Sequence, residues 1–357
     1  MIMKKILYIV NNLIVGGIEK VCWEIVSHID LKQYPIDFLV AADKGTEQYY
    51  DTKIQELGCR VYKGGAIYNK NDKRKFLCFE KELIQKNHYD IVHSHMDFMN
   101  VFTLKVAKEE GVPIRVSHVH TAFLNGDKLK GKKKWKRKIQ QILLCYYATD
   151  KLGCSKAALE HYYGKKQGTV LYNGFEFKKK FNFEQAYTKN IITVGRIDSQ
   201  KNPEFIVEII YYLKQLCDEF KLYWIGEGVK KLEMEQKAKK LGLEEDIVFV
   251  GCTTEIIPYL NRCGIAIYPS IYEGLGISVV EAQLAGCFTF YSDGVPQEAD
   301  IGYAMCIPLG KGAKSWAETI YDFIENDQYK CYNINVNLAE KYDVCHMVSE
   351  LEKIYQQ

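Results

Sequence analysis

The chain has 357 residues, of which 47% are hydrophobic, 26% are charged and only 7 are proline. This ordinary globular balance excludes disordered and collagen-like proteins, and the length predicts two domains of roughly 150 residues or more. Every apolar run is shorter than the roughly 18 residues that a membrane-spanning helix needs, so we expect a soluble protein.

The N-terminus and the cysteines indicate a cytoplasmic protein. The apolar run from Ile6 ends at Val10, before two asparagines and without a small-residue cleavage site, which indicates a buried strand rather than a signal peptide. The 12 cysteines include no Cys-x-x-Cys pair and are scattered along the chain. This usage is typical of a reducing cytosol rather than of a disulfide framework.

The net charge of +3 hides one basic segment. Residues 126–138 hold eight basic side chains and one acid, a net +7, so the rest of the chain sums to −4. A nucleic-acid-binding protein usually spreads its positive charge over a face or a motif, so we expect no nucleic-acid partner. The residues of this basic segment are Lys128, Lys130, Lys132, Lys133, Lys134, Trp135, Lys136, Arg137 and Lys138.

Two series of alternating strands and helices follow one another along the chain. In the first series, apolar β-branched runs predict strands at Ile6–Val10, Ile36–Val40, Ile91–His93 and Ile114–Val119. Apolar residues at helical spacing predict helices at Ile18–Ile29, Asp51–Leu57, Arg74–Asn87 and Val101–Glu110.

The second series begins after residue 190 and has the same alternation. It predicts strands at Ile191–Val194, Leu222–Ile225, Ile247–Val250, Ile265–Tyr268 and Phe288–Tyr291, with helices near 203–217, 229–241, 255–262, 275–285 and 313–326. Such alternation predicts an α/β protein of two doubly wound, Rossmann-like domains with parallel sheets. The polar stretch 175–189 is the expected linker, and ligands should bind where strands end and helices begin.

Paired glycines follow the first strand. Gly16 and Gly17 precede an amphipathic helix, without the further glycines of a dinucleotide fingerprint or the lysine of a P-loop. They form either a plain turn or a place where a ligand can approach the free N–H groups of the helix.

Paired histidines end two other strands of the first domain, as His93-Ser-His95 and His118-Val-His120. Alternate residues of a strand share one face, so the members of each pair should point the same way. These imidazoles fit three interpretations: core histidines with hydrogen bonds, a zinc site, or neutral groups that bind a substrate hydroxyl. No further ligand type recurs nearby, which weighs against zinc.

Two cations follow the first strand of the second domain. Gly195 and Arg196 end this strand, and Lys201 comes just before a helix that starts at Pro203. Two fixed positive charges beside a helix N-terminus are suited to a diphosphate.

A glycine loop with two carboxylates follows a later strand of the same domain. Glu273 lies in the loop and Glu281 lies eight residues on, inside the next helix. A carboxylate pair is also typical of glycoside hydrolases. Hydrolysis would account for the glutamates alone, whereas a nucleotide-sugar site accounts for them together with Arg196 and Lys201.

Over nearly its whole length the chain resembles the retaining GT-B glycosyltransferases of family 4, especially those of bacterial exopolysaccharide and capsule synthesis. The residues that carry the resemblance are Gly16-Gly-Ile-Glu-Lys20, Asp90-Ile-Val-His-Ser-His-Met96, Arg115-Val-Ser-His-Val-His120, Tyr172-Asn-Gly174, Val194-Gly-Arg196 with Lys201-Asn202, and Glu273 through Glu281.

The resemblance implies a role for each matching residue. Arg196 and Lys201 would neutralise the donor diphosphate, Glu281 would hold the ribose and Glu273 would contact the transferred sugar. His120 would hydrogen-bond that sugar near the reacting carbon, and neither a metal nor another cofactor would be needed. Further donor residues would be Gly16, Gly17, Gly195, Gly274, Leu275 and Gly276, and the acceptor or cleft residues would be His95, His118 and Asn173.

The resemblance also implies how the chain divides. An acceptor-binding domain at 1–174, a linker at 175–189 and a nucleotide-sugar-binding domain at 190–337 would face a central cleft. A C-terminal helix at 338–357 would pack back on the first domain, as the apolar residues spaced three or four apart from Leu338 to Tyr355 suggest.

The basic segment runs into a helical pattern with Trp135, Ile139, Ile142 or Leu143, and Tyr146 on one stripe. Either this stripe packs on the first domain while the lysines stay solvated, or the helix lies on an anionic membrane. Family members often use lipid-linked acceptors, which favours a peripheral position on the inner face of the cytoplasmic membrane.

The leading hypothesis is a retaining glycosyltransferase that moves a hexosyl or N-acetylhexosaminyl group. The donor would be a nucleotide-diphosphate sugar, with UDP favoured, and the acceptor a glycan or lipid-linked glycan of a cell-surface polysaccharide. An idle nucleotide-sugar-binding or membrane-scaffold protein and a nucleotide-sugar epimerase remain alternatives on the same fold. A nicotinamide oxidoreductase is disfavoured, because no Gly-x-Gly-x-x-Gly follows a strand.

Overall fold

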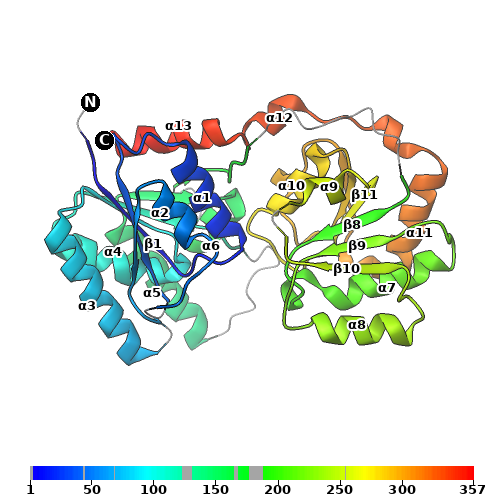
Figure 1. The fold of residues 1–357 in the computed structure, drawn as a ribbon, viewed down its shortest axis with the longest axis horizontal. Coiled ribbons are helices and arrows are strands. Elements are labelled where there is room, and N and C mark those ends of the chain that lie inside the picture. Colours follow the sequence, from blue (N-terminus) through cyan, green and yellow to red (C-terminus); the bar gives the residue numbers. More distant parts are fainter. Residues whose placement is uncertain are drawn as a thin grey trace. The chain divides into compact units, whose positions relative to one another are not determined.

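The computed structural model describes residues 3–42, 45–67, 69–122, 131–164, 168–176, 188–253 and 255–357. These residues form two compact α/β units (Figure 1). The first unit holds the described residues up to Ala122, those of 131–176, and Lys341–Gln357, whereas the second unit holds residues 188–340.

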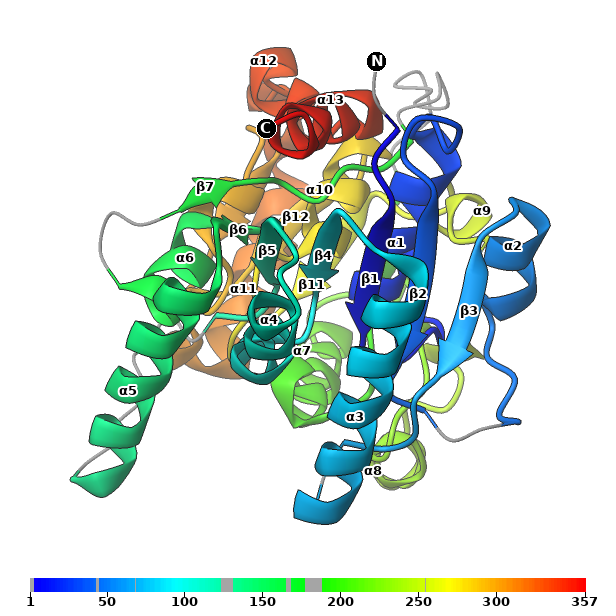
Figure 2. The same cartoon turned by 90° about the vertical axis from the view of Figure 1, so that its left-hand side faces the viewer.

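The first unit is built on a seven-stranded parallel sheet in the order β3-β2-β1-β4-β5-β6-β7 (Figure 2). Its central strands are buried along nearly their whole length, as expected where helices cover both faces. The strands are β1 (Ile6–Val10), β2 (Ile36–Val40), β3 (Arg60–Lys63), β4 (Ile91–Ser94), β5 (Ile114–Val119), β6 (Asp150–Gly153) and β7 (Thr169–Val170). The helices between them are α1 (Gly17–His28), α2 (Asp51–Glu56), α3 (Lys70–Asn87), α4 (Asn100–Glu109), α5 (Lys132–Tyr147) and α6 (Lys156–Tyr163).

The second unit has a six-stranded parallel sheet in the order β10-β9-β8-β11-β12-β13. Its core packs apolar strand residues against α7 and α11, with Trp224 and Trp316 fully buried. The strands are β8 (Ile191–Val194), β9 (Leu222–Ile225), β10 (Ile247–Gly251), β11 (Ile265–Tyr268), β12 (Phe288–Tyr291) and β13 (Ala304–Cys306). The helices are α7 (Pro203–Lys214), α8 (Lys231–Lys240), α9 (Ile257–Leu260), α10 (Ile277–Leu284), α11 (Gly312–Glu325) and α12 (Val336–Glu340).

All nine predicted strands are present, within one residue at each end. The strands that the sequence did not predict are β3, β6, β7 and β13, which lie at or next to the edges of the two sheets. Edge strands are buried less fully and therefore lack the continuous apolar run of a central strand, as Arg60–Lys63 illustrates. Helix α6, of eight residues, was also not predicted.

The C-terminal stretch forms two helices rather than one. Helix α12 ends at Glu340 and α13 (Val344–Tyr355) begins after Asp343, whose carboxylate accepts hydrogen bonds from two N–H groups of the first turn. The predicted apolar stripe is therefore wrong for Leu338, which is exposed, and for Cys345. Helix α13 packs on α1 in the first unit, which confirms that the chain crosses back.

Residue Phe175, placed at the start of the predicted linker, is tied to the first unit by a bridge to Asp343. Its backbone N–H donates to the carbonyl of Tyr342, and its own carbonyl accepts from the N–H of Val344. Most of the predicted linker, residues 177–187, lies outside the described residues. Among the helices that the structure describes, none combines the length and the apolar character needed to cross a bilayer.

Candidate functional site

The expected cations of the second unit, Arg196 and Lys201, form one polar cluster with Glu273. Lys201 follows β8, and Glu273 lies in the loop after the neighbouring strand β11, so the sheet order brings together residues that are 72 positions apart. The Nζ of Lys201 lies 2.6 Å from Oε1 of Glu273. The side chains are 18% and 9% exposed, so this pair sits at the surface of the core rather than in bulk water.

Gln200 connects the cluster and was not singled out from the sequence. Its amide nitrogen donates to Oε2 of Glu273 at 3.3 Å and to the carbonyl of Tyr272 at 3.1 Å. Its amide oxygen accepts from Nη2 of Arg196 at 3.2 Å. The side chain of Arg196 is 68% exposed, and its Nη2 also lies 3.4 Å from Oδ2 of Asp198. The one sequence signal that could have indicated Gln200 as a site residue is its position directly before Lys201.

The turn before α7 holds Lys201 in place. Asp198 accepts hydrogen bonds from the backbone N–H groups of Gln200 and Lys201. Asn202 is left-handed, with φ 56°, and Pro203 occupies the first turn of α7, as the sequence predicted. The turn therefore fixes the direction in which the lysine leaves the backbone.

The loop after β11 leads directly into α10. Glu273 is fixed by a backbone hydrogen bond from its N–H to the carbonyl of Gly294. Gly276 has φ 87°, in the left-handed region that favours glycine, and precedes the first residue of α10. Glu281 is the fifth residue of this helix and is partly exposed. Gly274, Leu275 and Gly276 thus line the approach to a helix N-terminus.

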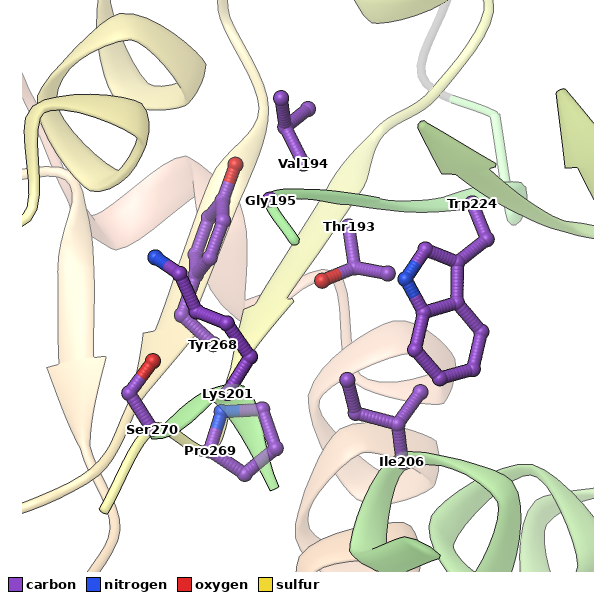
Figure 3. A pocket seen from close by; sticks show the side chains of 9 residues that line it. All are labelled: Thr193, Val194, Gly195, Lys201, Ile206, Trp224, Tyr268, Pro269 and Ser270. Atoms are coloured by element: carbon purple, nitrogen blue, oxygen red, sulfur yellow. The ribbon is translucent and has the colours of Figure 1, made fainter. Parts of the chain in front are cut away.

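The glycine after β8 makes room for the lysine. A Cβ on Gly195 would lie 2.8 Å from Cε of Lys201, so the lysine stem packs on the glycine backbone. Below it, a cavity of about 10 Å³ lies among Gly195, Lys201, Tyr268 and Ser270 (Figure 3). This volume is close to the space that one water molecule needs.

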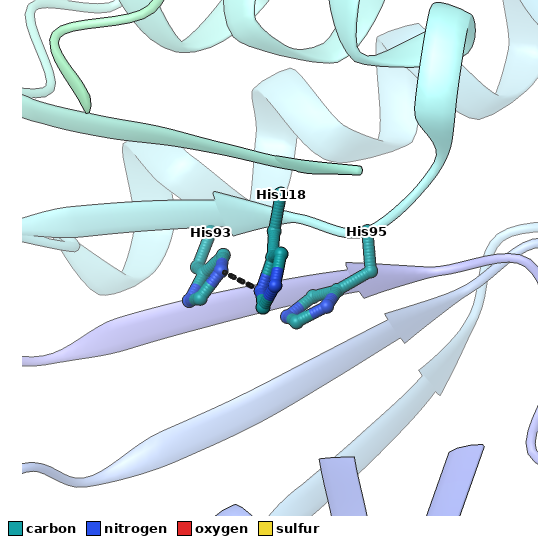
Figure 4. A group of neighbouring side chains, drawn as sticks. All are labelled: His93, His95 and His118. Atoms are coloured by element: carbon teal, nitrogen blue, oxygen red, sulfur yellow. Dashed lines mark hydrogen bonds between the residues drawn. The ribbon is translucent and has the colours of Figure 1, made fainter. Parts of the chain in front are cut away.

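In the first unit the two histidine pairs form one stack. His93 and His95 belong to β4 and its end, and His118 and His120 belong to β5 and its end. The Nε2 of His93 lies 3.3 Å from Nδ1 of His118 (Figure 4). The Nδ1 of His95 lies 2.9 Å from Nε2 of His120. Ring centroids are 4.2 Å apart within the first pair and 4.1 Å apart within the second. The prediction that each pair points one way is confirmed.

All four imidazoles are neutral at physiological pH. Burial lowers the pKa of His120 to about 3 and lowers the pKa of the other three well below the ordinary value. His120 keeps 7% of its surface exposed, whereas His93 and His118 have none. Asp97 accepts a hydrogen bond from the backbone N–H of His120, which fixes the end of β5.

Three of the four imidazoles lie close enough together to be compared with a zinc site. Among the described residues, His93, His95 and His118 bring one ring nitrogen each to within 4.8 Å of one another. Tetrahedral zinc with bonds of about 2.0–2.1 Å needs nitrogens about 3.3 Å apart. Both ring nitrogens of His93 are already hydrogen-bonded, one to Tyr355 and one to His118.

The remaining expected residues of the first unit lie in different surroundings. Gly16 precedes the first turn of α1, where a Cβ would lie 2.3 Å from the carboxylate of Glu19. Gly17 is exposed, and a Cβ added there would meet no atom of the described residues within 4 Å. Asn173 is buried, and its Oδ1 has no hydrogen-bond partner in the described part of the chain.

Helix α5 exposes its apolar stripe. Trp135, Ile139, Ile142 and Tyr146 are 71%, 38%, 60% and 63% exposed, whereas Leu144 faces the core. The interpretation that this stripe packs on the first domain is therefore wrong for these four residues. Beside them, Val101, Phe102, Trp135 and Ile139 line a largely apolar groove of about 670 Å³ between α4 and α5.

The basic side chains of α5 are solvated beside this stripe. Lys132, Lys134, Lys136 and Lys138 are exposed, and Arg137 lies over the ring of Phe98. Lys128 and Lys130 of the basic segment, and the side chain of Lys133, lie outside the described residues.

Comparison with known proteins covers both units. Residues 15–178 match the family model described as Glycosyltransferase Family 4, and residues 175–340 match the one described as Glycosyl transferases group 1. Over its length the chain is 26% identical to the putative glycosyltransferase EpsF of Bacillus subtilis, covering 99% of this chain and 96% of that protein. It is 24% identical to the capsular polysaccharide biosynthesis glycosyltransferase CapH of Staphylococcus aureus, covering 99% of both.

Two further similarities bear on ligands and fold. The chain is 23% identical to the UDP-Gal:α-D-GlcNAc-diphosphoundecaprenol α-1,3-galactosyltransferase of Escherichia coli. This similarity covers 76% of this chain and 75% of that protein. The crystal structure of Anabaena Alr3699/HepE in complex with UDP and glucose superposes with a TM-score of 0.79 at 16% identity, covering 99% of this chain and all of that one. The second similarity establishes the shared two-domain GT-B fold.

Proposed function

Because this chain belongs to the glycosyltransferases of family 4, we propose that it transfers a sugar from a UDP-sugar to a glycan or lipid-linked acceptor, with retention of anomeric configuration. The supporting relatives take part in capsular polysaccharide synthesis or use a UDP-sugar with an undecaprenol-linked acceptor. We assign the reaction to the synthesis of a bacterial surface polysaccharide.

The observation that carries this proposal is the cluster formed by Arg196, Lys201 and Glu273. Lys201 is mostly buried and Arg196 is exposed, and both precede the same helix. Two cations with a carboxylate beside them suit a sugar diphosphate. The diphosphate would contact the two cations and the free N–H groups at the start of α10. Glu273 would accept hydrogen bonds from the sugar hydroxyls, and Glu281 from the ribose.

The cations also account for the chemistry. The acceptor hydroxyl attacks the anomeric carbon while the bond from that carbon to the diphosphate oxygen breaks. Negative charge then develops on the leaving diphosphate, where fixed positive groups stabilise the transition state. The departing phosphate oxygen takes the acceptor proton on the same face, which gives retention without a separate protein base.

The same arrangement supports a reaction that needs no metal ion. Lys201 and Arg196 would supply the positive charge that a divalent cation provides to the leaving group in other transferases. His120, neutral because it is buried, would hydrogen-bond the transferred sugar in the first unit. These assignments extend the family resemblance to this chain. They comprise His120 as the sugar contact and, as lining residues, Gly16, Gly17, Gly195, His95, His118 and Asn173.

The exposed stripe of α5 supports peripheral attachment to an anionic membrane. Apolar side chains such as Trp135 and Ile142 would enter the interfacial region, and the lysines would contact anionic headgroups. The protein would then meet a lipid-linked acceptor at the membrane surface, on the cytoplasmic face.

Calorimetric titration of the purified protein with UDP and with GDP, each with and without EDTA, tests the donor site. We expect UDP to bind more tightly than GDP, with no change on adding EDTA, and we expect Lys201→Ala to weaken binding. The matched control is Lys214→Ala, since Lys214 pairs with Asp246 elsewhere in the same unit. Binding of neither nucleotide would favour an idle protein, and loss of binding in EDTA would contradict metal independence.

A further inference from the structure

A chain of hydrogen bonds joins the C-terminal helix to the histidine stack. The hydroxyl of Tyr8 in β1 lies 2.6 Å from the hydroxyl of Tyr355, the last residue of α13. The Tyr355 hydroxyl lies 2.6 Å from Nδ1 of His93, whose Nε2 lies 3.3 Å from Nδ1 of His118. The four side chains come from four elements, and each has essentially no exposed surface.

Proton counting leaves two directions of donation along this chain, and each leaves one buried proton without an acceptor. Among the described residues Tyr8 has no hydrogen-bond partner for its hydroxyl other than Tyr355, so donation from Tyr355 to Tyr8 would leave the Tyr8 proton unpartnered. In the other direction Tyr8 donates to Tyr355, Tyr355 donates to Nδ1 of His93, and the unpartnered proton lies on Nε2 of His118. We adopt the second direction, because it places this proton in the ring that stacks on His120, which keeps 7% of its surface exposed.

The second direction defines both histidine tautomers. Because Nδ1 of neutral His93 accepts, its proton is on Nε2 and is donated to Nδ1 of His118. The proton of neutral His118 is then on its Nε2, and this nitrogen is buried with no partner in the described part of the protein. The ring that carries it stacks on His120, with centroids 4.1 Å apart.

We propose that Tyr355 and His93 are positioning residues, which hold the His118 proton on Nε2 so that this N–H can bind a substrate oxygen beside His120. The inference rests on the proposed function for its substrate, but the tautomers themselves do not depend on it. It adds Tyr355 and His93 to the transferase site, two residues that are 262 positions apart in the sequence.

The substitution Tyr355→Phe removes the hydroxyl and keeps the ring, which packs on Tyr34 and His93. The matched control is Tyr34→Phe. Tyr34 is equally buried and touches the same ring, but its hydroxyl bonds to Gln33 and not to the chain.

Two measurements separate positioning from a structural role. Histidine side-chain ¹⁵N–¹H spectra report the tautomer of His118, and steady-state kinetics with a nucleotide sugar report kcat and KM. We expect wild type and Tyr34→Phe to show the Nε2–H form of His118, and Tyr355→Phe to lose it in part. We expect Tyr355→Phe to lower kcat about tenfold, the factor for one hydrogen bond of about 1.4 kcal/mol, with the donor KM within about twofold.

An unchanged His118 tautomer in Tyr355→Phe, or an equal loss of kcat in Tyr34→Phe, would overturn the proposal. If the wild-type protein transferred no sugar while the spectra changed as expected, the proposed function would fail and the positioning of His118 would stand. If the protein transferred sugar but wild-type His118 carried its proton on Nδ1, the positioning inference alone would be wrong.

Discussion

The Nζ of Lys201 is held 2.6 Å from Oε1 of Glu273 although the two residues belong to loops after different strands. The family resemblance assigns the lysine to the diphosphate and the glutamate to the sugar. These two ligand groups are joined by one bond in a nucleotide sugar, so the proposed donor would contact both side chains. It also means that an incoming diphosphate must compete with Glu273 for the lysine.

Replacing Lys201 with alanine removes a fixed charge from the site of the leaving group. We expect kcat to fall by about a hundred- to thousandfold, since one stabilising donor in a solvent-poor site is worth about 3–4 kcal/mol. Initial rates of sugar transfer at saturating donor measure this. Lys214→Ala serves as the control, and a comparable loss of kcat in that variant would point to a general loss of folding.

Replacing Glu273 with glutamine separates binding from transfer. The variant keeps the shape of the side chain but releases Lys201 from its ion pair, so we expect UDP to bind at least as tightly as in wild type. Transfer should still slow, by about tenfold or more, because the sugar loses a charged acceptor. Calorimetry and kinetics on the same preparation test the two statements, and a marked weakening of UDP binding would assign Glu273 to the nucleotide instead.

Gly226 is predicted to be intolerant of any side chain. It has φ 142°, and a Cβ there would lie 2.0 Å from the carbonyl oxygen of Gly195. We expect Gly226→Ala to destabilise the second unit by about 2–3 kcal/mol, through backbone strain and the clash together. Thermal melting measures this, with Gly310→Ala as control because a Cβ at Gly310 would meet no described atom within 4 Å. Equal melting of the two variants would contradict the packing described.

The histidine stack predicts acid sensitivity. Below about pH 6.5 the unfolded chain protonates its histidines, whereas burial lowers the folded-state pKa of His120 to about 3 and the pKa of its three neighbours in the same direction. Unfolding then takes up protons, so the free energy of unfolding decreases as pH falls, by about 1.4 kcal/mol per pH unit for each such group.

Two carboxyls of the described residues act in the opposite direction. Burial raises the pKa of Asp97 and Glu80, so these groups favour the folded state as they protonate. We expect the urea midpoint to fall steeply between pH 7 and pH 5.5. A constant midpoint over this range would show that the stack is not neutral and buried in solution.

The stripe on α5 predicts binding to anionic vesicles. The double variant Trp135→Ser/Ile142→Ser should bind phosphatidylglycerol vesicles more weakly by about tenfold or more, since it removes two apolar anchors. Charge reversal at Lys132, Lys134 and Lys136 should abolish the preference for phosphatidylglycerol over phosphatidylcholine. Co-sedimentation measures both.

The control for the membrane experiment lies in the second unit. Val229 and Leu232 are 93% and 74% exposed. Leu232 lies in α8, where two glutamates partly offset four lysines, so Val229→Ser/Leu232→Ser should bind vesicles like wild type. Unchanged binding after charge reversal on α5 would rule out this helix as the membrane contact.

Local patterns in the sequence were enough for the central strands and for singling out residues at the strand ends. Central strands such as Ile6–Val10 are buried on both faces, so burial itself imposes a continuous apolar run that can be recognised. Gly276 and Pro203 mark helix starts because their backbone preferences act within one turn. Since parallel strands all end at one edge, residues just after them could be singled out without coordinates.

Contacts between distant residues had no such local cause. Nothing near Tyr355 in the sequence indicates that its hydroxyl meets His93, because that contact arises from the packing of α13 on the first unit. Likewise, the apolar stripe of α5 has the same spacing whether it is buried or exposed, and only the position of the helix on the unit leaves Trp135 in solvent. Apolar runs and backbone preferences act over a few residues and can be recognised in the sequence. Hydrogen-bond partners and exposure depend on which elements pack together.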